Sequence, residues 1–394
     1  MCSPRWDPLS AESGFAVRGA VAFRGAPLAH VLEEQFSQDY RDKGPPRRAA
    51  LLNALTARYG EDAVAHLPHA LSEVPPSPAA KRSPVQKRSR AGASPLVSLI
   101  MPTRARADLL RQCVESCFTN SSYRPMELIV VDHDSEGPEM AAALGEIGAL
   151  ANTTIVRETG AFNYSRLINA GASQARGEVL ILLNDDIQAL SSDWLDDLVA
   201  LALRPQIGAV GARLHYPGGR IQHDGVVLGI GGLAGHPGRL QKANFINPDP
   251  RHAWPRTVSA VTGACLAVKR ASFEQMRGLD EAFAIEFNDI DFCLRLGEQG
   301  FKSALNPYVR LIHHENATRG SRVSETLSAR IKQDRAVFLM RWGHLLADDP
   351  WYSPNLSLDD DRYALADAPR VPEIIAPRSR PTKITRRDSA HERV

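Results

Sequence analysis

Short hydrophobic runs alternate with amphipathic segments over residues 96–186 of this 394-residue chain. Runs rich in Val, Ile and Leu are typical of strands covered on both faces, and apolar residues three or four apart are typical of helices. Their alternation predicts a parallel, doubly wound α/β sheet with right-handed crossovers. The predicted strands are LVSLIMP, ELIVVD, TTIVRE and EVLILL, and the predicted helices are ADLLRQCVESCF, Pro138–Ile147 and SRLINAGASQARG.

The pattern after residue 186 is less regular. It predicts helices over DWLDDLVALAL and DIDFCLRLGEQG, strands over IGAVGARL, TVSAVTGACLAV and Tyr308–Ile312, and a hairpin arm over GRIQHDGVVLG. Residues 225–238 contain six glycines and are expected to form a mobile loop. Gly229, Gly231 and Ala234 in this loop spell G-x-G-x-x-A, as in a dinucleotide-binding fingerprint, but HPGRL follows where that motif requires a helix. We therefore reject a dinucleotide site.

The ends of the chain differ in composition from its centre. Residues 1–74 are weakly patterned, with one amphipathic helix expected over Arg48–Tyr59 and a role that the sequence does not indicate. Residues 75–95 hold five prolines and five basic residues without an acidic one, which predicts a linker. We expect a single catalytic domain over 96–358 and a C-terminal tail over 359–394, disordered at its end.

Composition narrows the class of protein. Hydrophobic residues make up 43% of the chain, enough for a large core, and the net charge of +2 names no partner. Neither a spanning segment nor a secretion signal is evident, and the five scattered cysteines form neither a zinc motif nor a disulfide framework. We expect a cytoplasmic protein that does not bind nucleic acid. The basic linker and tail suggest peripheral contact with an anionic membrane at its inner face.

Polar residues directly follow three of the predicted strands. Asn184, Asp185 and Asp186 end one strand, Asp132 ends another, and Pro102, Thr103 and Arg104 end the first. The carboxyl ends of parallel strands share one edge of a sheet, where ligands of α/β proteins bind. Oxygen ligands there suit a hard divalent cation, which in turn can hold a diphosphate, and a carboxylate such as Asp132 can accept the N3–H of uracil or thymine.

A second group of candidates lies in the C-terminal half. Asp289 and Asp291 begin a predicted helix, where residues two apart point to nearly opposite sides, so at most one faces a shared site. Asp291 has Arg295 four residues on as an ion-pair partner, which leaves Asp289 free to act as a general base. His313 and His314 end the last strand, and only one of them can enter the cleft. In the following loop, Arg319 and Arg322 are candidates to clamp a diphosphate.

Together these stretches resemble family 2 glycosyltransferases of the GT-A fold, most closely the bacterial members that build rhamnose-containing and other surface polysaccharides. The resemblance spans about Leu96 to Leu358. It is carried by PLVSLIMPTRARADLLRQCVES, SYRPMELIVVDHDS, FNYSRLINAGASQARGEVLILLNDDI, VTGACLAVKR, FNDIDFCLRLGEQGF, LIHHENATRG and DPWYSPNLSL, which occur in the family's order.

The resemblance implies a role for each matching residue. Asp186 is expected to bind Mg²⁺ or Mn²⁺ with His313, and Asp289 falls at the position of the catalytic base. Contacts to a UDP- or dTDP-linked sugar donor are expected from Pro102, Thr103, Arg104, Asp132, Asn163, Asn169, Asn184, Asp185 and Arg319. The implied reaction is sugar transfer, with inversion, to a glycan or lipid-linked acceptor. Asn184 and Asn288 stand where many members carry an acid.

Two alternatives compete with this interpretation. A sugar-phosphate nucleotidyltransferase would share the sheet and the metal but requires a glycine-rich loop after its first strand, where this chain has MPTRARAD. A catalytically inactive module that serves as a scaffold in polysaccharide assembly agrees with Asn184 and Asn288, whereas Asp186, Asp289 and His313 argue against it.

Overall fold

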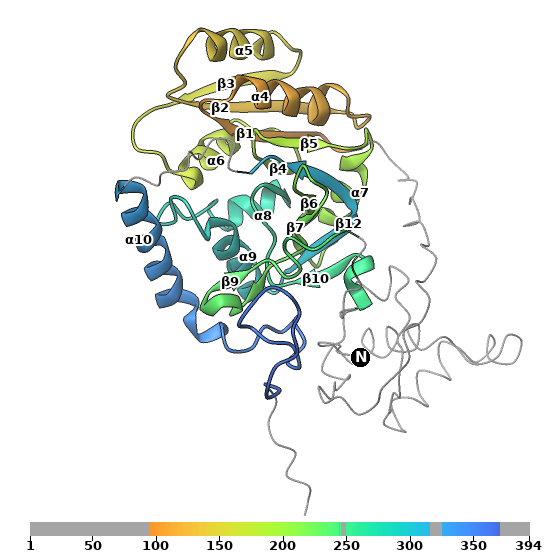
Figure 1. The fold of residues 1–394 in the computed structure, drawn as a ribbon. Coiled ribbons are helices and arrows are strands. Elements are labelled where there is room, and N and C mark those ends of the chain that lie inside the picture. The colour runs from red at the N-terminus through yellow and green to blue at the C-terminus, as the bar shows by residue number, and fades with distance from the viewer. Residues whose placement is uncertain (1–93, 244, 246–249, 316–324, 371–394) are drawn as a thin grey trace, which may run out of the picture.

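The computed structural model describes residues 94–243, 245, 250–315 and 325–370, and its centre is one mixed sheet. The sheet strands are β1 (Val97–Thr103), β2 (Met126–His133), β3 (Thr153–Glu158), β4 (Val179–Leu183), β5 (Ile187–Ala189), β6 (Ile207–His215), β7 (Ile221–His223), β10 (Arg256–Val258), β11 (Cys265–Lys269) and β12 (Lys302–His313). Their order is β10-β12-β6-β11-β4-β1-β2-β3, with β5 beside β12 and β7 beside β6 (Figure 1). β1 to β4 run parallel, as do β6 and β12, while β11 lies antiparallel between β4 and β6.

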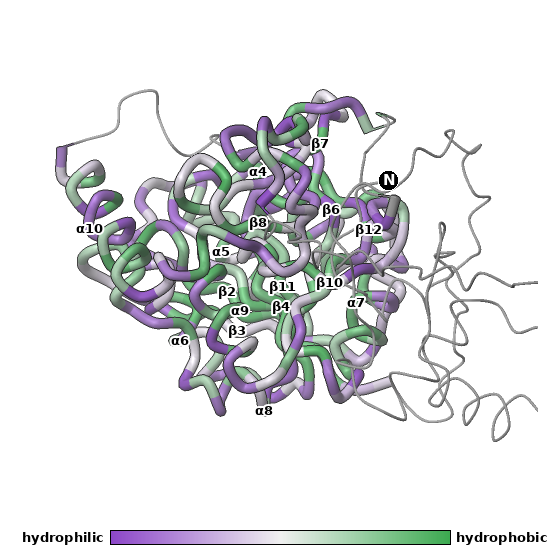
Figure 2. The backbone as a smooth tube through the Cα atoms, turned by 90° about the horizontal axis from the view of Figure 1, so that it is seen from below, coloured by the Kyte–Doolittle hydropathy of each residue, from purple (hydrophilic) through white to green (hydrophobic). Residues whose placement is uncertain are grey.

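Helices cover both faces of this sheet. On one face lie α4 (Ala107–Val114), α5 (Pro138–Gly148) and α7 (Trp194–Ala202), whose buried side chains join one hydrophobic core. On the other lie α6 (Tyr164–Ser173), α8 (Arg270–Gln275), α9 (Asn288–Glu298) and the end of α10 (Glu325–Trp342), which share a second core. The central strands between them are hydrophobic, β4 throughout and β11 up to Val268 (Figure 2). The expected α/β class is therefore confirmed. None of the described helices is long and apolar enough to cross a membrane.

Two expected elements differ from those observed. TVSAVTGACLAV was predicted as one strand but forms β10 and β11, which lie at separate places in the sheet. Residues 259–264 between them form an isolated bridge at Ala260 and a turn at residues 263–264, an interruption that a continuous hydrophobic run does not reveal. The last strand, expected from Tyr308, begins at Lys302, because a bulge accommodates Pro307 between the two halves of β12.

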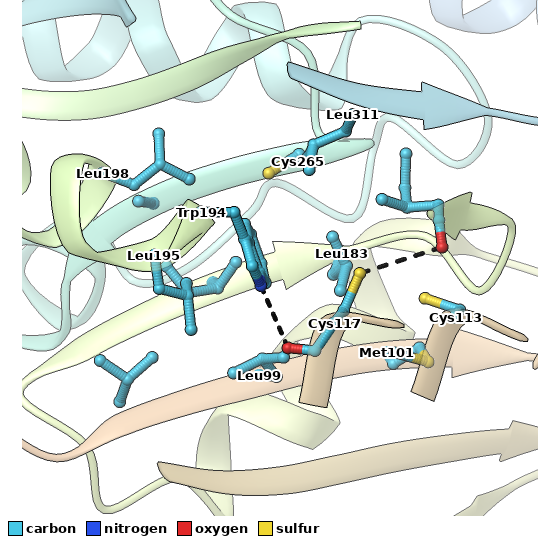
Figure 3. Packing of buried hydrophobic residues seen from close by; sticks show 14 of the residues in the cluster. Leu99, Met101, Cys113, Cys117, Leu183, Trp194, Leu195, Leu198, Cys265 and Leu311 are labelled. Atoms are coloured by element: carbon cyan, nitrogen blue, oxygen red, sulfur yellow. Dashed lines mark hydrogen bonds between the residues drawn. The ribbon is translucent and has the colours of Figure 1, made fainter. Parts of the chain in front are cut away.

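Buried cysteine thiols contact the backbone of the turn that follows β4, residues 184–187. Cys113 and Cys117 are fully buried in the same hydrophobic core, and the Cys117 thiol lies 3.9 Å from the carbonyl oxygen of Ile187 (Figure 3). The Cys113 thiol donates to the carbonyl of Asn184 at 3.4 Å. The indole nitrogen of Trp194 donates to the carbonyl of Cys117 at 3.2 Å, within the π-helical turn Glu115–Thr119 that continues α4. These contacts support the backbone of the Asn184–Asp186 turn on its buried side.

The glycine-rich segment forms a short hairpin of β8 (Val227–Leu228) and β9 (Ala234–Gly235) and contains no α-helix, in agreement with rejection of the dinucleotide fingerprint. The chain after α10 crosses over this hairpin. Asp349 accepts a hydrogen bond from the backbone of Leu228 at 2.7 Å, and the backbone N–H of Gly231 donates to the carbonyl of Leu358 at 2.8 Å. The C-terminal segment, residues 343–370, is thereby attached to the domain.

Candidate active site

A cavity of about 600 Å³ opens at the carboxyl ends of β1 and β4. It contains most of the candidates from the first half of the chain and Asp289 and His313 from the second. Its lining residues are Pro102, Thr103, Arg104, Phe162, Tyr164, Leu167, Asn184, Asp185, Asp186, Thr262, Gly263, Ala264, Ile285, Asn288, Asp289, His313, Glu315, Thr326, Leu327 and Arg330. A volume in this range is typical of sites for small organic ligands.

Thr103 and Asp185 join the ends of β1 and β4. These strands are parallel neighbours, so their last residues meet at one edge, and the Thr103 hydroxyl donates to Asp185 Oδ2 at 2.6 Å. Burial raises the pKa of Asp185 to about 7, although this hydrogen bond lowers it, and the negative charge of Asp186 adds to the rise. The corner thus concentrates negative charge that a cation would stabilise.

Asp186 and His313 face each other in the wall of this cavity. Asp186 follows β4 and His313 ends β12, and 3.0 Å separates Asp186 Oδ1 from His313 Nε2. His314, one residue on, lies near Gln188 instead, with 3.4 Å between its Nε2 and the amide oxygen. The expectation that only one of the two histidines faces the cleft is therefore confirmed, and that histidine is His313.

Asp186 and His313 have the features expected of ligands for a divalent cation. Asp186 Oδ1 is buried and accepts no hydrogen bond within the described residues, because its contact with His313 lacks hydrogen-bond geometry. The described chain contains no cluster of three or more His, Cys, Asp or Glu side chains arranged as a complete metal shell. Two protein ligands with open positions are the arrangement that suits a cation shared with the phosphates of a substrate. The residues therefore fit a cation bound together with a diphosphate.

Asp289 lies at the first turn of α9 and is held by backbone donors. Its Oδ2 accepts from the N–H of Gly263 at 2.7 Å and its Oδ1 from the N–H of Ile290 at 2.8 Å. Asp291 points away and pairs with Arg295 at 2.7 Å, as its spacing predicted. Only Asp289 of these two carboxylates lines the cavity.

Asp132 lies at the expected strand end, level with Thr103 in the β1–β2 pairing, but apart from the residues that line the cavity. It is 2% exposed. Its Oδ2 accepts from Arg157 at 2.7 Å and its Oδ1 from the backbone of Ser135 at 3.3 Å. In this structure both carboxylate oxygens of Asp132 are thus hydrogen-bonded within the protein.

Asn163 and Asn169 also lie outside the cavity lining, and both connect α6 to residues 278–281. The Asn163 side chain caps α6 by accepting from the N–H of Arg166 at 3.1 Å, and it donates to the carbonyl of Glu281. The Asn169 side chain accepts from the N–H of Leu279 and donates to its carbonyl, both at 2.9 Å. These contacts give both residues a structural role. Arg319 and Arg322 lie outside the described residues, as do the helix expected over residues 48–59 and the basic linker.

Several cavity residues escaped the sequence analysis. Tyr164 donates to the carbonyl of Gly263 at 3.0 Å, and burial raises its pKa, with nearby Asp289 adding to the rise, so it remains a neutral donor. Arg330 reaches the cavity from α10, which is far from the other residues in the sequence. Tyr164 lies in FNYSRLINAGASQARGEVLILLNDDI, one of the stretches that carry the family resemblance, so the sequence contained a signal that could have identified it. Arg330 had none, since its helix carries basic residues on several sides.

A second cavity, of about 490 Å³, adjoins the first. The two share Thr262, His313 and Glu315. The other walls come from β7, the glycine-rich hairpin and the C-terminal segment, and they include Gln222, His223, Ile230, Ala234, Gly235, His236, Arg239, Asp360 and Asp361. A ligand in this second cavity would therefore meet a ligand in the first beside His313.

Residues 98–277 match the family model described as glycosyl transferase family 2. The uncharacterized protein y4gI of Sinorhizobium fredii is 41% identical over 275 residues, which are 69% of this chain and 30% of y4gI. The O-antigen biosynthesis protein RfbC of Myxococcus xanthus is 36% identical over 302 residues, 75% of this chain and 23% of RfbC. The chain thus spans less than a third of either relative's length.

This chain is also similar to two more distant proteins. The N-acetylglucosaminyl-diphospho-decaprenol L-rhamnosyltransferase of Mycobacterium tuberculosis is 24% identical over 244 residues, 53% of this chain and 73% of that enzyme. A mannosyltransferase from Pyrobaculum calidifontis, solved in complex with GDP-Man and Mn²⁺, matches 65% of each chain at 19% identity and a TM-score of 0.45.

The family match covers the strands from β1 to β11, and among them β1 and β4 carry Thr103, Asp185 and Asp186 to the cavity at their carboxyl ends. The mixed sheet agrees with the GT-A fold implied by the resemblance. Residues 98–277 of this chain therefore form a family 2 glycosyltransferase domain.

Proposed function

We propose that this domain transfers a sugar, with inversion, from a nucleoside diphosphate donor to a hydroxyl group of a glycan or lipid-linked acceptor in surface polysaccharide synthesis. One observation carries the proposal. Asp186 and His313, a pair suited to a divalent cation, line the same 600 Å³ cavity as Asp289, a carboxylate suited to act as a base. The name of the O-antigen relative supports the proposed pathway class.

The donor would occupy the first cavity. Asp186 and His313 would hold Mg²⁺ or Mn²⁺, which as a Lewis acid stabilises the negative charge of the departing diphosphate. Arg104 and Arg330 line the same cavity and add positive charge near the phosphates. Pro102, Thr103, Asn184 and Asp185 form the neighbouring wall, where we place the nucleoside and its ribose. UDP- and dTDP-linked sugars are the proposed donors.

The acceptor would approach from the second cavity, which meets the first at Thr262, His313 and Glu315. Asp289 accepts the proton of the acceptor hydroxyl while the hydroxyl oxygen bonds to the anomeric carbon. The bond between that carbon and the diphosphate oxygen breaks in the same step, and its electron pair leaves with the diphosphate. A single displacement of this kind inverts the anomeric centre. The backbone N–H groups of Gly263 and Ile290 orient the Asp289 carboxylate for this role.

The test combines binding with turnover. Thermal unfolding is measured with UDP, dTDP, GDP and CMP, each with and without Mn²⁺, for the native protein and for Asp186→Ala. We expect stabilisation by one nucleotide that requires Mn²⁺ and is lost in Asp186→Ala. Hydrolysis or transfer of the matching sugar nucleotide should then be lost in Asp289→Asn.

The scaffold alternative makes the opposite prediction, and Asn184 and Asn288 are the residues that favour it. If none of the four nucleotides stabilises the protein and no sugar nucleotide is consumed, the catalytic proposal is wrong.

Contact with the membrane is tested separately, by co-sedimentation of the full chain with anionic vesicles at low salt. Absence of binding there contradicts the expected peripheral contact with an anionic membrane and leaves the catalytic proposal unaffected.

A further inference from the structure

His313 is connected on its far side to two residues that the sequence analysis did not select. Gln222 lies in β7, and its Oε1 is 2.7 Å from His313 Nδ1. The Gln222 Nε2 donates in turn to Glu315 Oε2 at 2.9 Å. Gln222 is 5% exposed and His313 9% exposed, so little water competes for the contact between them.

The chemistry of these groups determines where the imidazole proton lies. A carboxylate only accepts hydrogen bonds, so Glu315 requires the NH₂ end of the Gln222 amide. The amide oxygen must then face His313, and because an amide oxygen only accepts, His313 Nδ1 must carry the proton. In neutral imidazole the other nitrogen, Nε2, then holds a lone pair, which points toward Asp186 Oδ1 at 3.0 Å.

Two lone pairs that face each other at this distance repel, and a cation between them removes the repulsion. The Asn184 amide agrees with this assignment, since its Nδ2 lies 3.3 Å from His313 Nε2 and can donate to it. Histidines that bind metals usually donate their second ring N–H to a carboxylate or carbonyl oxygen, which fixes the tautomer and strengthens the ligand. Gln222 supplies such an oxygen, and Glu315 fixes the orientation of its amide.

We infer that Gln222 and Glu315 are positioning residues that hold His313 with its proton on Nδ1, so that Nε2 is presented to a divalent cation shared with Asp186. This inference rests on the metal site of the proposed function. Neither residue contacts the substrate in this role, because both act through His313.

The tautomer is measurable without any ligand. In the full chain labelled with ¹⁵N-histidine, long-range ¹H–¹⁵N spectra distinguish a protonated from an unprotonated ring nitrogen, and the His313→Ala spectrum identifies the His313 signals. We expect Nδ1 of His313 to be protonated in the native protein. Gln222→Leu should abolish this preference, and Gln222→Glu, which keeps an acceptor oxygen, should retain it. A native His313 with its proton on Nε2 overturns the inference.

Glu315→Lys provides a second variant at an exposed position, where misfolding is not a concern. A lysine ammonium only donates, so it would attract the amide oxygen of Gln222 and turn the NH₂ toward His313. We expect the His313 proton to move to Nε2. Gln188→Leu is the matched control, because it removes a glutamine from the neighbouring His314 and should leave the His313 signals unchanged.

Metal affinity is the second readout, measured by Mn²⁺ electron paramagnetic resonance with and without UDP or dTDP. Loss of the second hydrogen bond to a metal-binding histidine typically weakens binding about 10–100-fold, and we expect this for Gln222→Leu but not for Gln188→Leu. If Mn²⁺ binds the native protein, is lost in His313→Ala and is unchanged in Gln222→Leu, this inference is wrong while the proposed function stands. If native protein binds no Mn²⁺ under either condition, both are wrong.

Discussion

The Oδ2 atom of Asp289 accepts a hydrogen bond of 2.7 Å from the backbone N–H of Gly263. This contact joins the first turn of α9 to the bend between β10 and β11, and it fixes the carboxylate at the wall of the larger cavity. A Cβ atom at position 263 would lie 3.4 Å from both Asp289 Cβ and the Tyr164 hydroxyl, an ordinary van der Waals distance. The orientation of Asp289 therefore depends on the backbone of this bend more than on the absence of a side chain there.

Asp289→Asn removes the proposed base and keeps the shape of the side chain. General base catalysis typically contributes about 10²–10⁴-fold, so kcat of sugar transfer should fall by this factor, while the affinity for nucleotide and Mn²⁺ is retained. Steady-state kinetics and nucleotide-induced thermal shifts measure the two effects. Asp291→Asn, which removes a buried carboxylate of the same helix turn, should instead lower stability. A kcat within twofold of native for Asp289→Asn would exclude this residue as the base.

Thr103→Val removes the 2.6 Å hydrogen bond to Asp185 without changing the size of the side chain. A buried acceptor that loses its partner costs about 1–3 kcal/mol, and we expect this loss in free energy of unfolding together with weaker nucleotide binding. Ser98→Ala is the control on the same strand, since the Ser98 hydroxyl donates to Glu127 at the opposite end of β1. It should lower stability without affecting nucleotide affinity. Equal nucleotide affinities for native protein and Thr103→Val would contradict a role of this corner in binding.

Asn184→Asp adds a third carboxylate beside Asp185 and Asp186. Without metal the added charge should destabilise the protein, because like charges that cannot be hydrated repel one another. With Mn²⁺ the variant should gain more stability than the native protein, since a ligand that binds only the folded state stabilises it according to its affinity. Thermal unfolding across a Mn²⁺ titration measures both effects. Asn288→Asp, at the first residue of α9, is the matched control, and its stability should depend less on Mn²⁺.

Asp224 is 1% exposed and is paired with Arg213 at 2.9 Å and Arg256 at 3.0 Å. Burial alone would raise its pKa, but the two guanidinium groups outweigh it and lower the pKa to about 2. Because the pKa is lower in the folded than in the unfolded state, the stabilisation is complete above about pH 4 and is lost as the pH falls toward 2.

Asp224→Asn leaves two buried arginines without their carboxylate, which should cost about 3–5 kcal/mol at neutral pH. Denaturant unfolding of native and variant protein at a series of pH values tests this. The difference between them should shrink below about pH 4, because the native carboxylate then becomes protonated as well. Glu146→Gln, which breaks the exposed pair with Arg111, should have little effect at any pH. A difference that stays constant down to pH 2 would contradict the assigned cause.

Gly229 and Gly231 provide a matched pair in the glycine-rich hairpin. Both have positive φ, so alanine strains the backbone at either position. At Gly229 the added Cβ would also lie 2.1 Å from the carbonyl oxygen of Leu346, whereas nothing lies within 4 Å at Gly231. Gly229→Ala should therefore displace the C-terminal segment, lower the melting temperature more than Gly231→Ala does, and increase proteolytic cleavage within 343–370. Similar cleavage of the two variants would show that the segment is not held at this contact.

The hydrophobic runs of the chain were sufficient to predict the parallel half of the sheet and its class. A strand buried on both faces must be largely apolar, so LVSLIMP, ELIVVD and EVLILL were recognisable without any tertiary information, and the placement of Thr103 and Asp185 at one edge followed from the topology. The spacing of Asp291 and Arg295 likewise predicted that Asp289 is the carboxylate that faces the cavity, because it depends only on helix geometry. The alternation along the last strand predicted that only one of His313 and His314 does so, and the tertiary structure identified it as His313.

Only the tertiary structure decided which polar residues are available at that edge. Asp132, Asn163 and Asn169 had the same signals in the sequence as the cavity residues, but Arg157 and the backbone of residues 278–281 occupy their side chains. Gln222, Glu315 and Arg330 reach the site from distant segments, and no local pattern marks such residues. Local periodicity reports which face of an element is buried, whereas the partner of a polar group depends on which segments fold against it.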